Sequence, residues 1–258
     1  MLISQLFQAV DLTKIHVAFV IKNLKTGESV SHHENEVVKS ASLIKIPIMA
    51  EVFRRVKDGK LTLQRRIAVT EADKVDGSIL SMLETGNQYS IKDLLTLMIV
   101  QSDNTAANLL IDNLGLDEIN ELIRCLDLKN TMLRRKMMDF QAGSAGRENV
   151  TTAGDMARLL ELLYQGAVID KTASADMLEI MKQQRDRSMM RLFIPDETVI
   201  AHKTGELDGL AHDAGIVFHP SGDYILVVFT WGALHNMVAR QSIGLIARAA
   251  YDYFTEKY

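Results

Sequence analysis

The stretch ASLIKIPIMA, residues 41–50, decides how this chain folds and where its chemistry lies. It opens an apolar-patterned run, Ile46 to Val56, that predicts a helix entered from a polar segment. Ser42 and Lys45 are three residues apart, so in a helix their side chains lie on one face and can meet. A serine at a helix N-terminus also lies where backbone N–H groups favour negative charge. The stretch therefore offers either a nucleophile with a candidate base or a serine that only caps a helix.

The composition is that of an ordinary soluble globular protein. The 258 residues are 47% hydrophobic and carry a formal net charge of -4, which suits one large domain or two interlocked subdomains. There is no basic stripe interleaved with aromatic residues, so we expect no nucleic-acid partner. No apolar run approaches the ~20 residues that a membrane span needs, so we expect no such span.

The N-terminus and the single cysteine bear on cellular location. Residues 1–12 lack a basic start, and their apolar positions are spaced like those of an amphipathic helix. We therefore expect a cytoplasmic protein, or an exported one if a leader has been removed. Cys125 is the only cysteine, which excludes an intrachain disulfide, and we expect it to be buried and inert. His32 and His33 are adjacent and would point to opposite faces of a strand, so we expect no metal site and no other cofactor.

Strand-like segments lie at both ends of the chain, with a helical block between them. The predicted strands cover residues 15–23, 29–32, 197–203, 214–219 and 224–231, and the predicted helices cover 46–56, 91–100, 105–111, 156–164, 170–181 and 236–254. This order predicts an α/β (α+β) fold, in which an antiparallel five-stranded sheet is flanked by helices and joined to an all-helical subdomain. We expect one domain over 1–258, its sheet subdomain from 1–38 and 195–258 and its helical subdomain from 39–194. The thirteen methionines lie largely in the helices, as adaptable core residues.

Two further motifs follow Ser42 and Lys45 in order. Ser102-Asp103-Asn104 lies between two predicted helices, and Lys203-Thr204-Gly205 lies at the end of a predicted strand. Alone, the first is a set of helix-capping residues and the second a strand-to-turn junction. Together, and with Thr151-Thr152 before a helix, the motifs resemble those of the class A β-lactamases and the related penicillin-binding proteins. The resemblance covers nearly the whole chain.

The resemblance implies a catalytic role for four side chains. Ser42 would attack a carbonyl carbon, and Lys45 would take the serine proton if it were uncharged. Burial and a second lysine nearby, Lys203, would disfavour the charged form of Lys45. Ser102 would relay a proton to the leaving nitrogen.

The resemblance also implies how a substrate would be held. Asn104 would hydrogen-bond the side-chain amide of the substrate, while Lys203 and Thr204 would hold its carboxylate. Gly205 would let the substrate lie close against the strand. The backbone N–H groups of Glu206 and of the nucleophile would hold the oxyanion. The implied substrate is a small β-lactam or an acyl-peptide-like amide.

The chain departs from the class A pattern in the loop before Thr151-Thr152. Class A β-lactamases carry Arg-x-Glu-x-x-x-Asn there, and the glutamate activates the deacylating water. Aligning Thr131 and Thr151-Thr152 without gaps places Arg135 on the arginine, Met137 on the glutamate and Gln141 on the asparagine. A thioether cannot accept a proton from water, so acylation should survive while rapid deacylation is in doubt.

Four further residues, two in this loop and two on later strands, bear on substrate binding and deacylation. We expect Glu148 and Asp139 to be ordinary loop carboxylates. Glu206 stands where a small residue is expected, and its charge should weaken carboxylate binding. His212 on the next strand is either a structural histidine or a compensating contact for that carboxylate.

Three functions stay open at this point. The first is a serine hydrolase that acylates Ser42 with a β-lactam or related amide and hydrolyses the acyl-enzyme, whether quickly or slowly. The second is a D-alanyl-D-alanine carboxypeptidase or an esterase, and the third is a non-turnover penicillin-binding module. The intact Ser42, Lys45, Ser102 and Lys203 argue against an inactive scaffold, and Met137 favours a trapped acyl-enzyme over fast hydrolysis.

Overall fold

Strands from both ends of the chain form one antiparallel sheet in the computed structural model, which describes residue 13 and residues 15–257. The strands are β1 (His16–Asn23), β2 (Ser29–His32), β7 (Val199–Leu207), β8 (Leu210–Phe218) and β9 (Tyr224–Trp231). Their order is β2-β1-β9-β8-β7, so β7 is an edge strand. The chain ends meet where β1 pairs with β9, from His16 opposite Trp231 to Asn23 opposite Tyr224. The predicted sheet and fold class are confirmed.

The segment between β2 and β7 is mainly helical. Its helices are η1 (Ala41–Ile44), α2 (Lys45–Lys57), η2 (Glu71–Asp73), η3 (Leu80–Met82), α3 (Ile91–Val100), α4 (Asn104–Leu114), α5 (Leu116–Cys125), α6 (Phe140–Ser144), α7 (Ala153–Tyr164), α8 (Lys171–Lys182) and η4 (Met190–Leu192). Two small antiparallel pairs, which the sequence did not predict, are β3 (Val38–Lys39) with β6 (Val150–Thr151) and β4 (Arg66–Ala68) with β5 (Gln88–Ser90). Strands of two or three residues are too short for an alternating pattern to reveal.

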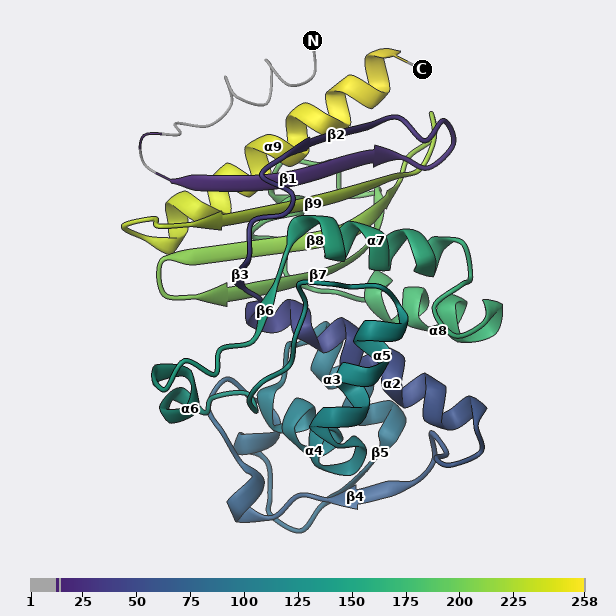
Figure 1. Ribbon diagram of the computed structural model, residues 1–258, viewed down its shortest axis with the longest axis vertical. Helices are drawn as coiled ribbons and strands as arrows, with labels where there is room; N and C mark the ends of the chain where they lie inside the picture. The colour runs from purple at the N-terminus through teal and green to yellow at the C-terminus, as the bar shows by residue number, and fades with distance from the viewer. Residues whose placement is uncertain (1–12, 14, 258) are drawn as a thin grey trace.

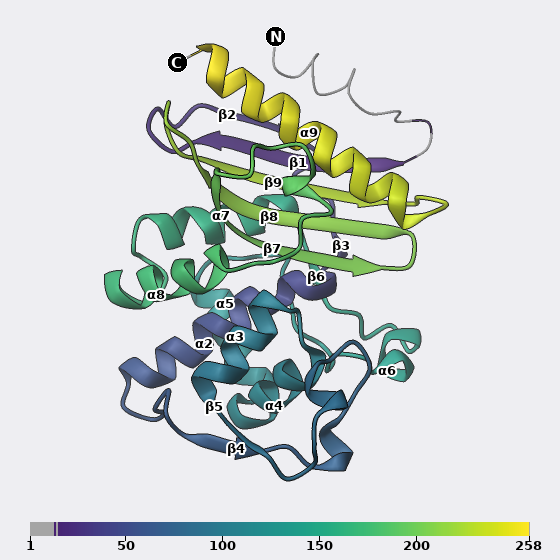
Figure 2. The same ribbon diagram turned by 180° about the vertical axis from the view of Figure 1, so that it is seen from behind.

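Helices cover both faces of the sheet. The C-terminal helix α9 (Asn236–Lys257) lies on one face, and α7 lies on the other (Figures 1 and 2). The remaining helical block lies beyond the β7 edge, where Figure 1 shows α2 to α5 gathered below the sheet. Because both faces are covered, β1, β8 and β9 are buried along nearly their whole lengths, which explains the continuous apolar runs of β1 and β9.

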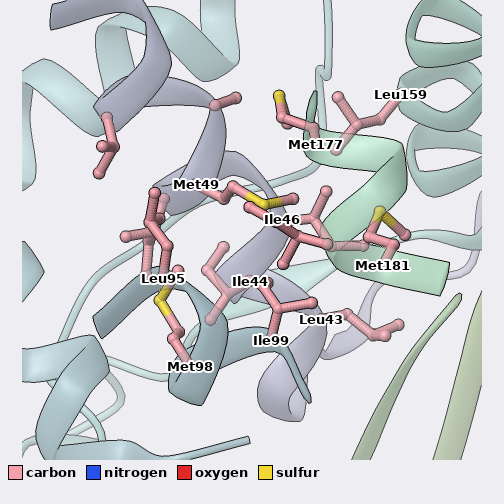
Figure 3. Close-up of a cluster of buried hydrophobic side chains, with 14 of the residues drawn as sticks. Leu43, Ile44, Ile46, Met49, Leu95, Met98, Ile99, Leu159, Met177 and Met181 are labelled. Atoms are coloured by element: carbon pink, nitrogen blue, oxygen red, sulfur yellow. The ribbon is translucent and has the colours of Figure 1, made fainter. Parts of the chain in front are cut away.

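The larger of the two hydrophobic clusters is built around α2. Every residue from Lys45 to Phe53 is buried, so this helix runs through the interior. Figure 3 shows Met49 of α2 among Leu95 and Met98 of α3 and Met177 of α8. All four side chains have no exposed surface, as expected for methionine used as adaptable core filler.

The structure corrects two expectations about strands and turns. β7 does not end at Lys203 but continues to Leu207, because Gly205 is an ordinary member of the strand and not part of a turn. His32 and His33 do not point to opposite faces: their rings lie 4.0 Å apart, centroid to centroid, in an edge-to-face contact. His33 lies beyond the end of β2 with a φ of 47°, and this left-handed residue turns the chain.

The expectation that Cys125 is buried is also wrong, because its side chain is exposed. The buried residues of α5 are Ile119, Leu122 and Ile123, which repeat at the helical spacing of three and four. Cys125 falls off that face. The helix expected within residues 1–12 lies outside the described residues. No helix in the part of the chain that the structure describes is long and apolar enough to cross a membrane.

Two methionines test the role of the core. Met49→Ala should lower the free energy of unfolding by about 2–5 kcal/mol, because it leaves a cavity in the cluster around α2. Met82→Ala, at a side chain that is 77% exposed, should change it by less than about 0.5 kcal/mol. Urea unfolding followed by the fluorescence of Trp231, the only tryptophan, measures both. Equal losses in the two variants would contradict the assigned core.

Candidate active site

Ser42 lies on a short 3₁₀ helix that packs against the edge of the sheet. η1 carries Ser42, and α2 begins only at Lys45, whose backbone N–H donates to the Ser42 carbonyl. In a 3₁₀ turn, residues three apart lie directly above one another. Ser42 and Lys45 therefore lie on one helical face, although Ser42 itself lies in the 3₁₀ turn that precedes the α-helix. Ala41, just before it, has a left-handed φ of 44°.

Gly205 of β7 allows this close packing. A Cβ atom at Gly205 would lie 3.0 Å from the backbone nitrogen of Ser42 and 3.1 Å from Cβ of Ala41. The space beside Gly205 is thus filled by the η1 turn, whereas the sequence analysis assigned it to substrate. β7 is an edge strand, so its outward backbone groups are not paired within the sheet. They face the turn that carries Ser42.

The amine of Lys45 is held by three oxygen atoms. Its Nζ lies 2.6 Å from the Ser102 carbonyl oxygen, 3.2 Å from Ser102 Oγ and 2.8 Å from Asn104 Oδ1. The side chain has no exposed surface. Burial, and next the charge of Lys203, hold the pKa of Lys45 well below its usual value, with Asp103 acting in the opposite direction. Lys45 therefore loses its proton more readily than an exposed lysine does.

The loop between α3 and α4 presents Ser102 to both lysines. Ser102 has a left-handed φ of 54°, and Lys203 Nζ donates to its Oγ over 3.0 Å. Asp103 fixes the loop because its buried carboxylate accepts from the backbone N–H of Ala106 (2.8 Å) and of Leu80 (3.0 Å). The first of these bonds caps α4.

Asn104 completes the loop. Its Nδ2 donates to the Asp76 carbonyl over 2.9 Å, and its Oδ1 accepts from Lys45. A side-chain amide has two N–H donors, so one remains for a ligand. Gly77 makes room for it, because a Cβ at Gly77 would lie 2.6 Å from Asn104 Nδ2.

Lys203 is enclosed beneath the same site. Its Nζ also donates to the Thr204 carbonyl over 2.7 Å, and its side chain has no exposed surface. Burial lowers the pKa of Lys203 to about 8, while the carboxylates of Asp213 and Asp186 act to raise it. Asp213 is itself buried and lies 2.9 Å from Nδ1 of His202. Sequence reasoning missed this pair because its two members are eleven residues apart on neighbouring strands.

Met137 lies on a loop that is tied to α4. Asn108 of α4 holds the loop backbone: its Nδ2 donates to the Met137 carbonyl (3.1 Å), and its Oδ1 accepts from the Met137 N–H (2.8 Å). Met137 then lines the same small cavity as Ser42. That cavity has a volume of about 70 Å³, and its lining residues are Ala41, Ser42, Asn104, Arg135, Met137, Met138, Phe140, Glu148, Asn149, Glu206 and Leu207.

The two loop carboxylates, Glu148 and Asp139, each bind a neighbouring group. Arg135 binds Glu148 through Nε (2.8 Å) and Nη2 (2.6 Å). Glu148 therefore lines the cavity as one member of an ion pair, whereas we expected an ordinary loop carboxylate. Asp139 accepts from the Ala142 N–H over 2.9 Å and caps α6. Gln141 is exposed on that helix. None of the three replaces a glutamate at Met137.

Glu206 is bound by side chains of α9, whereas His212 is buried in the sheet. The Glu206 carboxylate accepts from Asn236 Nδ2 (2.6 Å) and from Arg240 Nη2 (2.6 Å) and Nε (3.1 Å), both on α9. His212 is buried, and burial lowers its pKa to about 4. Its Nε2 contacts the Lys39 carbonyl over 3.0 Å. His212 is thus an uncharged structural residue and offers no positive charge to a substrate.

The structure holds no candidate metal centre within residues 13 and 15–257, since no three potential His, Cys, Asp or Glu ligands converge there. The fold and the site define a class of protein, the serine β-lactamases and related penicillin-binding proteins. Comparison with known sequences makes this specific: a family model for the β-lactamase enzyme family matches residues 2–254, and the chain belongs to that family. The family resemblance that the sequence predicted is thereby confirmed.

Individual relatives are distant in sequence and close in fold. A β-lactamase of Rhodobacter capsulatus is 29% identical over 185 residues, which are 70% of this chain but only 62% of that protein, less than two thirds of its length. The β-lactamase Toho-1 of Escherichia coli is 24% identical over 88% of this chain and 79% of its own. Among solved structures, a β-lactamase of Sphaerobacter thermophilus (30% identity, 99% and 97% coverage) and PBP-A (27% identity, 99% and 96% coverage) each superimpose with a TM-score of 0.90.

The lowered pKa of Lys203 on β7 should make the free energy of unfolding depend on pH. Between pH about 8 and 10.5 the unfolded chain holds a proton at Lys203 that the folded chain has lost, so the free energy of unfolding should rise with pH across that range. The Lys203 contribution should reach about 3 kcal/mol. Lys203→Met should remove this rise, measured by urea unfolding at the two pH values. Lys60→Met, at an exposed lysine, is the control, and an unchanged pH slope in Lys203→Met would contradict the assignment.

Proposed function

We propose that this protein is an active-site serine hydrolase that acylates Ser42 with a β-lactam or a related amide and releases the acyl group slowly. One observation carries the proposal. The chain of contacts from Lys45 through Ser102 Oγ to Lys203, with distances of 3.2 and 3.0 Å, lies beside the cavity that Ser42 lines. A nucleophile, an amine of lowered pKa and a second hydroxyl are the groups that acyl transfer to a serine requires.

The acylation step uses the uncharged form of Lys45. An uncharged amine has two N–H donors and one lone pair, so Lys45 can donate to the Ser102 carbonyl and Asn104 Oδ1 while its lone pair faces Ser102 Oγ. Within the described residues, the three partners of Lys45 Nζ do not include Ser42 Oγ. Substrate binding must therefore bring the lone pair within reach of Ser42 Oγ, directly or through a water, as is common when catalytic contacts tighten only in the complex.

The rest of the step follows from the neighbours of Ser42. Lys45 removes the proton as Ser42 Oγ attacks the carbonyl carbon, and the C–N bond of the amide breaks as the tetrahedral species collapses. The backbone N–H groups of Ser42 and Glu206, on the turn and the strand edge that meet at Gly205, would stabilise the oxyanion. Ser102, in contact with both lysines, passes a proton to the leaving nitrogen.

Release of the acyl group lacks an efficient base. Met137 faces the cavity with a thioether, which cannot deprotonate water. The carboxylates that line the cavity, Glu148 and Glu206, are each bound by an arginine, Arg135 and Arg240 respectively, so their oxygens are already engaged in ion pairs. These points favour a long-lived acyl-enzyme over fast turnover of the antibiotic.

Covalent labelling tests the nucleophile. Intact-mass spectrometry after mixing with benzylpenicillin should show one adduct that persists over minutes to hours, because deacylation lacks a base. Ser42→Ala should abolish the adduct completely. Labelling that survives in Ser42→Ala would overturn the nucleophile, and an adduct that disappears while hydrolysed drug accumulates would show that another group activates water.

A second variant tests the missing base. Met137→Glu should speed loss of the acyl group by at least about tenfold, because a positioned general base contributes roughly 10²–10⁴-fold when its geometry is ideal. Met132→Glu adds the same charge at an exposed methionine of the same segment and serves as the control. The decay of the adduct mass after removal of free penicillin gives the rate. Equal decay in the wild type and Met137→Glu would mean that position 137 does not face the acyl group.

A further inference from the structure

The two lysines that share Ser102 Oγ need different charges for the proposed acylation. Lys45 has to be uncharged to take the Ser42 proton, and a charged Lys203 disfavours a second positive charge on Lys45. Both side chains lack exposed surface, and both amines lie within 3.2 Å of the same oxygen. The shared oxygen does not distinguish the two amines, so the groups behind them must.

The groups behind Lys203 include a buried pair on the opposite face of the sheet. Side chains alternate between the two faces along a strand. Ala201 belongs to the cluster around α2, so Lys203, two residues further along β7, faces that side. Ile200 belongs to the other cluster, which includes residues of α9, so His202 faces α9. Asp213 of β8 meets His202 on that face.

Gly215 makes room for the pair. It lies opposite His202 in the register of β7 and β8, and a Cβ at Gly215 would be 2.5 Å from His202 Cβ. His202 Nδ1 lies 2.9 and 3.2 Å from the two carboxylate oxygens of Asp213, and the second oxygen also accepts from the Met190 N–H over 3.0 Å. An ionised carboxylate can only accept hydrogen bonds, so Nδ1 of His202 carries a proton.

His202 does not cancel the charge of Asp213. Its Nε2 is buried and has no hydrogen-bond partner among the described residues, so a second ring proton would be an unpaired buried donor, which is unfavourable. His202 is therefore the uncharged tautomer with its proton on Nδ1. Within residues 15–257, the ion-pair criterion joins Asp213 to this histidine and to no lysine or arginine. The negative charge of Asp213 is thus buried, and solvent ions screen it little.

Other charged groups surround the pair. Asp186, in the segment between α8 and β7, accepts from the Ser188 N–H (2.8 Å) and hydroxyl (2.7 Å). Arg191, in the same segment, is half-buried and interacts electrostatically with Asp213. Further charged groups are Arg240 and Arg248 of α9, which bind Glu206 and Asp252, and on the active-site side Lys45 and Asp103.

We propose that Asp213, together with Asp186, is a positioning residue for the acylation of Ser42: the two carboxylates balance the Lys203 ammonium through the sheet, so that the proton of the lysine pair stays on Lys203 and Lys45 keeps its lone pair. The inference rests on the proposed function and names what gives the two lysines their separate roles. Burial lowers the pKa of Lys203 to about 8, and both carboxylates act in the opposite direction. Without them, the lysine pair would lose its last proton at lower pH.

The pH dependence of acylation tests the inference. The rate of adduct formation with benzylpenicillin, followed by intact mass, should fall as the pH rises through about 8, where Lys203 loses its proton. Asp213→Asn should move this alkaline limb to lower pH by about one unit, because it removes a negative charge that favours the ammonium. Asp186→Asn should move the limb in the same direction by less. Its side chain is only half-buried, so this variant decides the matter if Asp213→Asn does not fold.

Asp223→Asn is the matched control. Asp223 follows the far end of β8, whose last residue lies five residues or about 17 Å along the strand from Asp213. Its carboxylate accepts from the Tyr164 hydroxyl over 2.9 Å. This variant removes the same charge from the same hairpin and should leave the alkaline limb where it is in the wild type.

Urea unfolding separates the inference from the proposed function, because it needs no substrate. In Asp213→Asn or Asp186→Asn, the rise in the free energy of unfolding assigned to Lys203 should begin at lower pH, since a lower folded-state pKa widens the range in which only the unfolded chain holds that proton. A merely structural role of Asp213 would lower stability at every pH and move neither the limb nor this onset. An unmoved limb and onset would overturn the inference while acylation stands. Absence of any adduct with the wild type would overturn the proposed function, and the onset of the rise would still show whether the carboxylates hold the proton on Lys203.

Discussion

The sharing of one hydroxyl oxygen by two buried lysine side chains is the constraint on which the rest of the structure depends. Lys45 and Lys203 each end within 3.2 Å of Ser102 Oγ, and neither has exposed surface. Two amines in such a place favour loss of a proton from one of them. They also tie together three segments that are remote in sequence: the start of α2, the loop between α3 and α4, and the edge strand β7. The chemistry and the junction between sheet and helices thus depend on the same contacts.

Much of this arrangement follows from local sequence. The five strands and the main helices could be predicted because apolar spacing reports burial along a single segment. The motif residues Ser42, Lys45, Ser102 and Lys203 could be proposed because their order matched a known pattern, and their roles remain proposals. The division of the chain at residues 38 and 195 also stays a prediction. The alignment of Met137 with the glutamate of the class A pattern also stays a prediction.

Other features could not be predicted, because they depend on partners far away in the chain. Arg240, which binds Glu206, comes 34 residues later in the chain, on α9. The sequence therefore shows the negative charge of Glu206 but not the arginine that pairs with it. Glu148 was expected to be an ordinary loop carboxylate, because nothing local in the sequence reveals its ion pair with Arg135. Cys125 was misplaced because a helix with apolar residues at three- and four-residue spacing still leaves some neighbours on its outer side.

The pairing of β1 with β9 has a consequence for how the protein forms. The two strands are about two hundred residues apart in the chain, yet they are neighbours in the middle of the sheet. During synthesis, β1 and β2 leave the ribosome about two hundred residues before their partner strand β9. Such distant pairings slow folding and leave a strand edge open to wrong partners in the meantime. Ser42 is likewise made long before Lys203 on β7, so the contacts around Ser102 that join the two lysines can form only after β7 has been made.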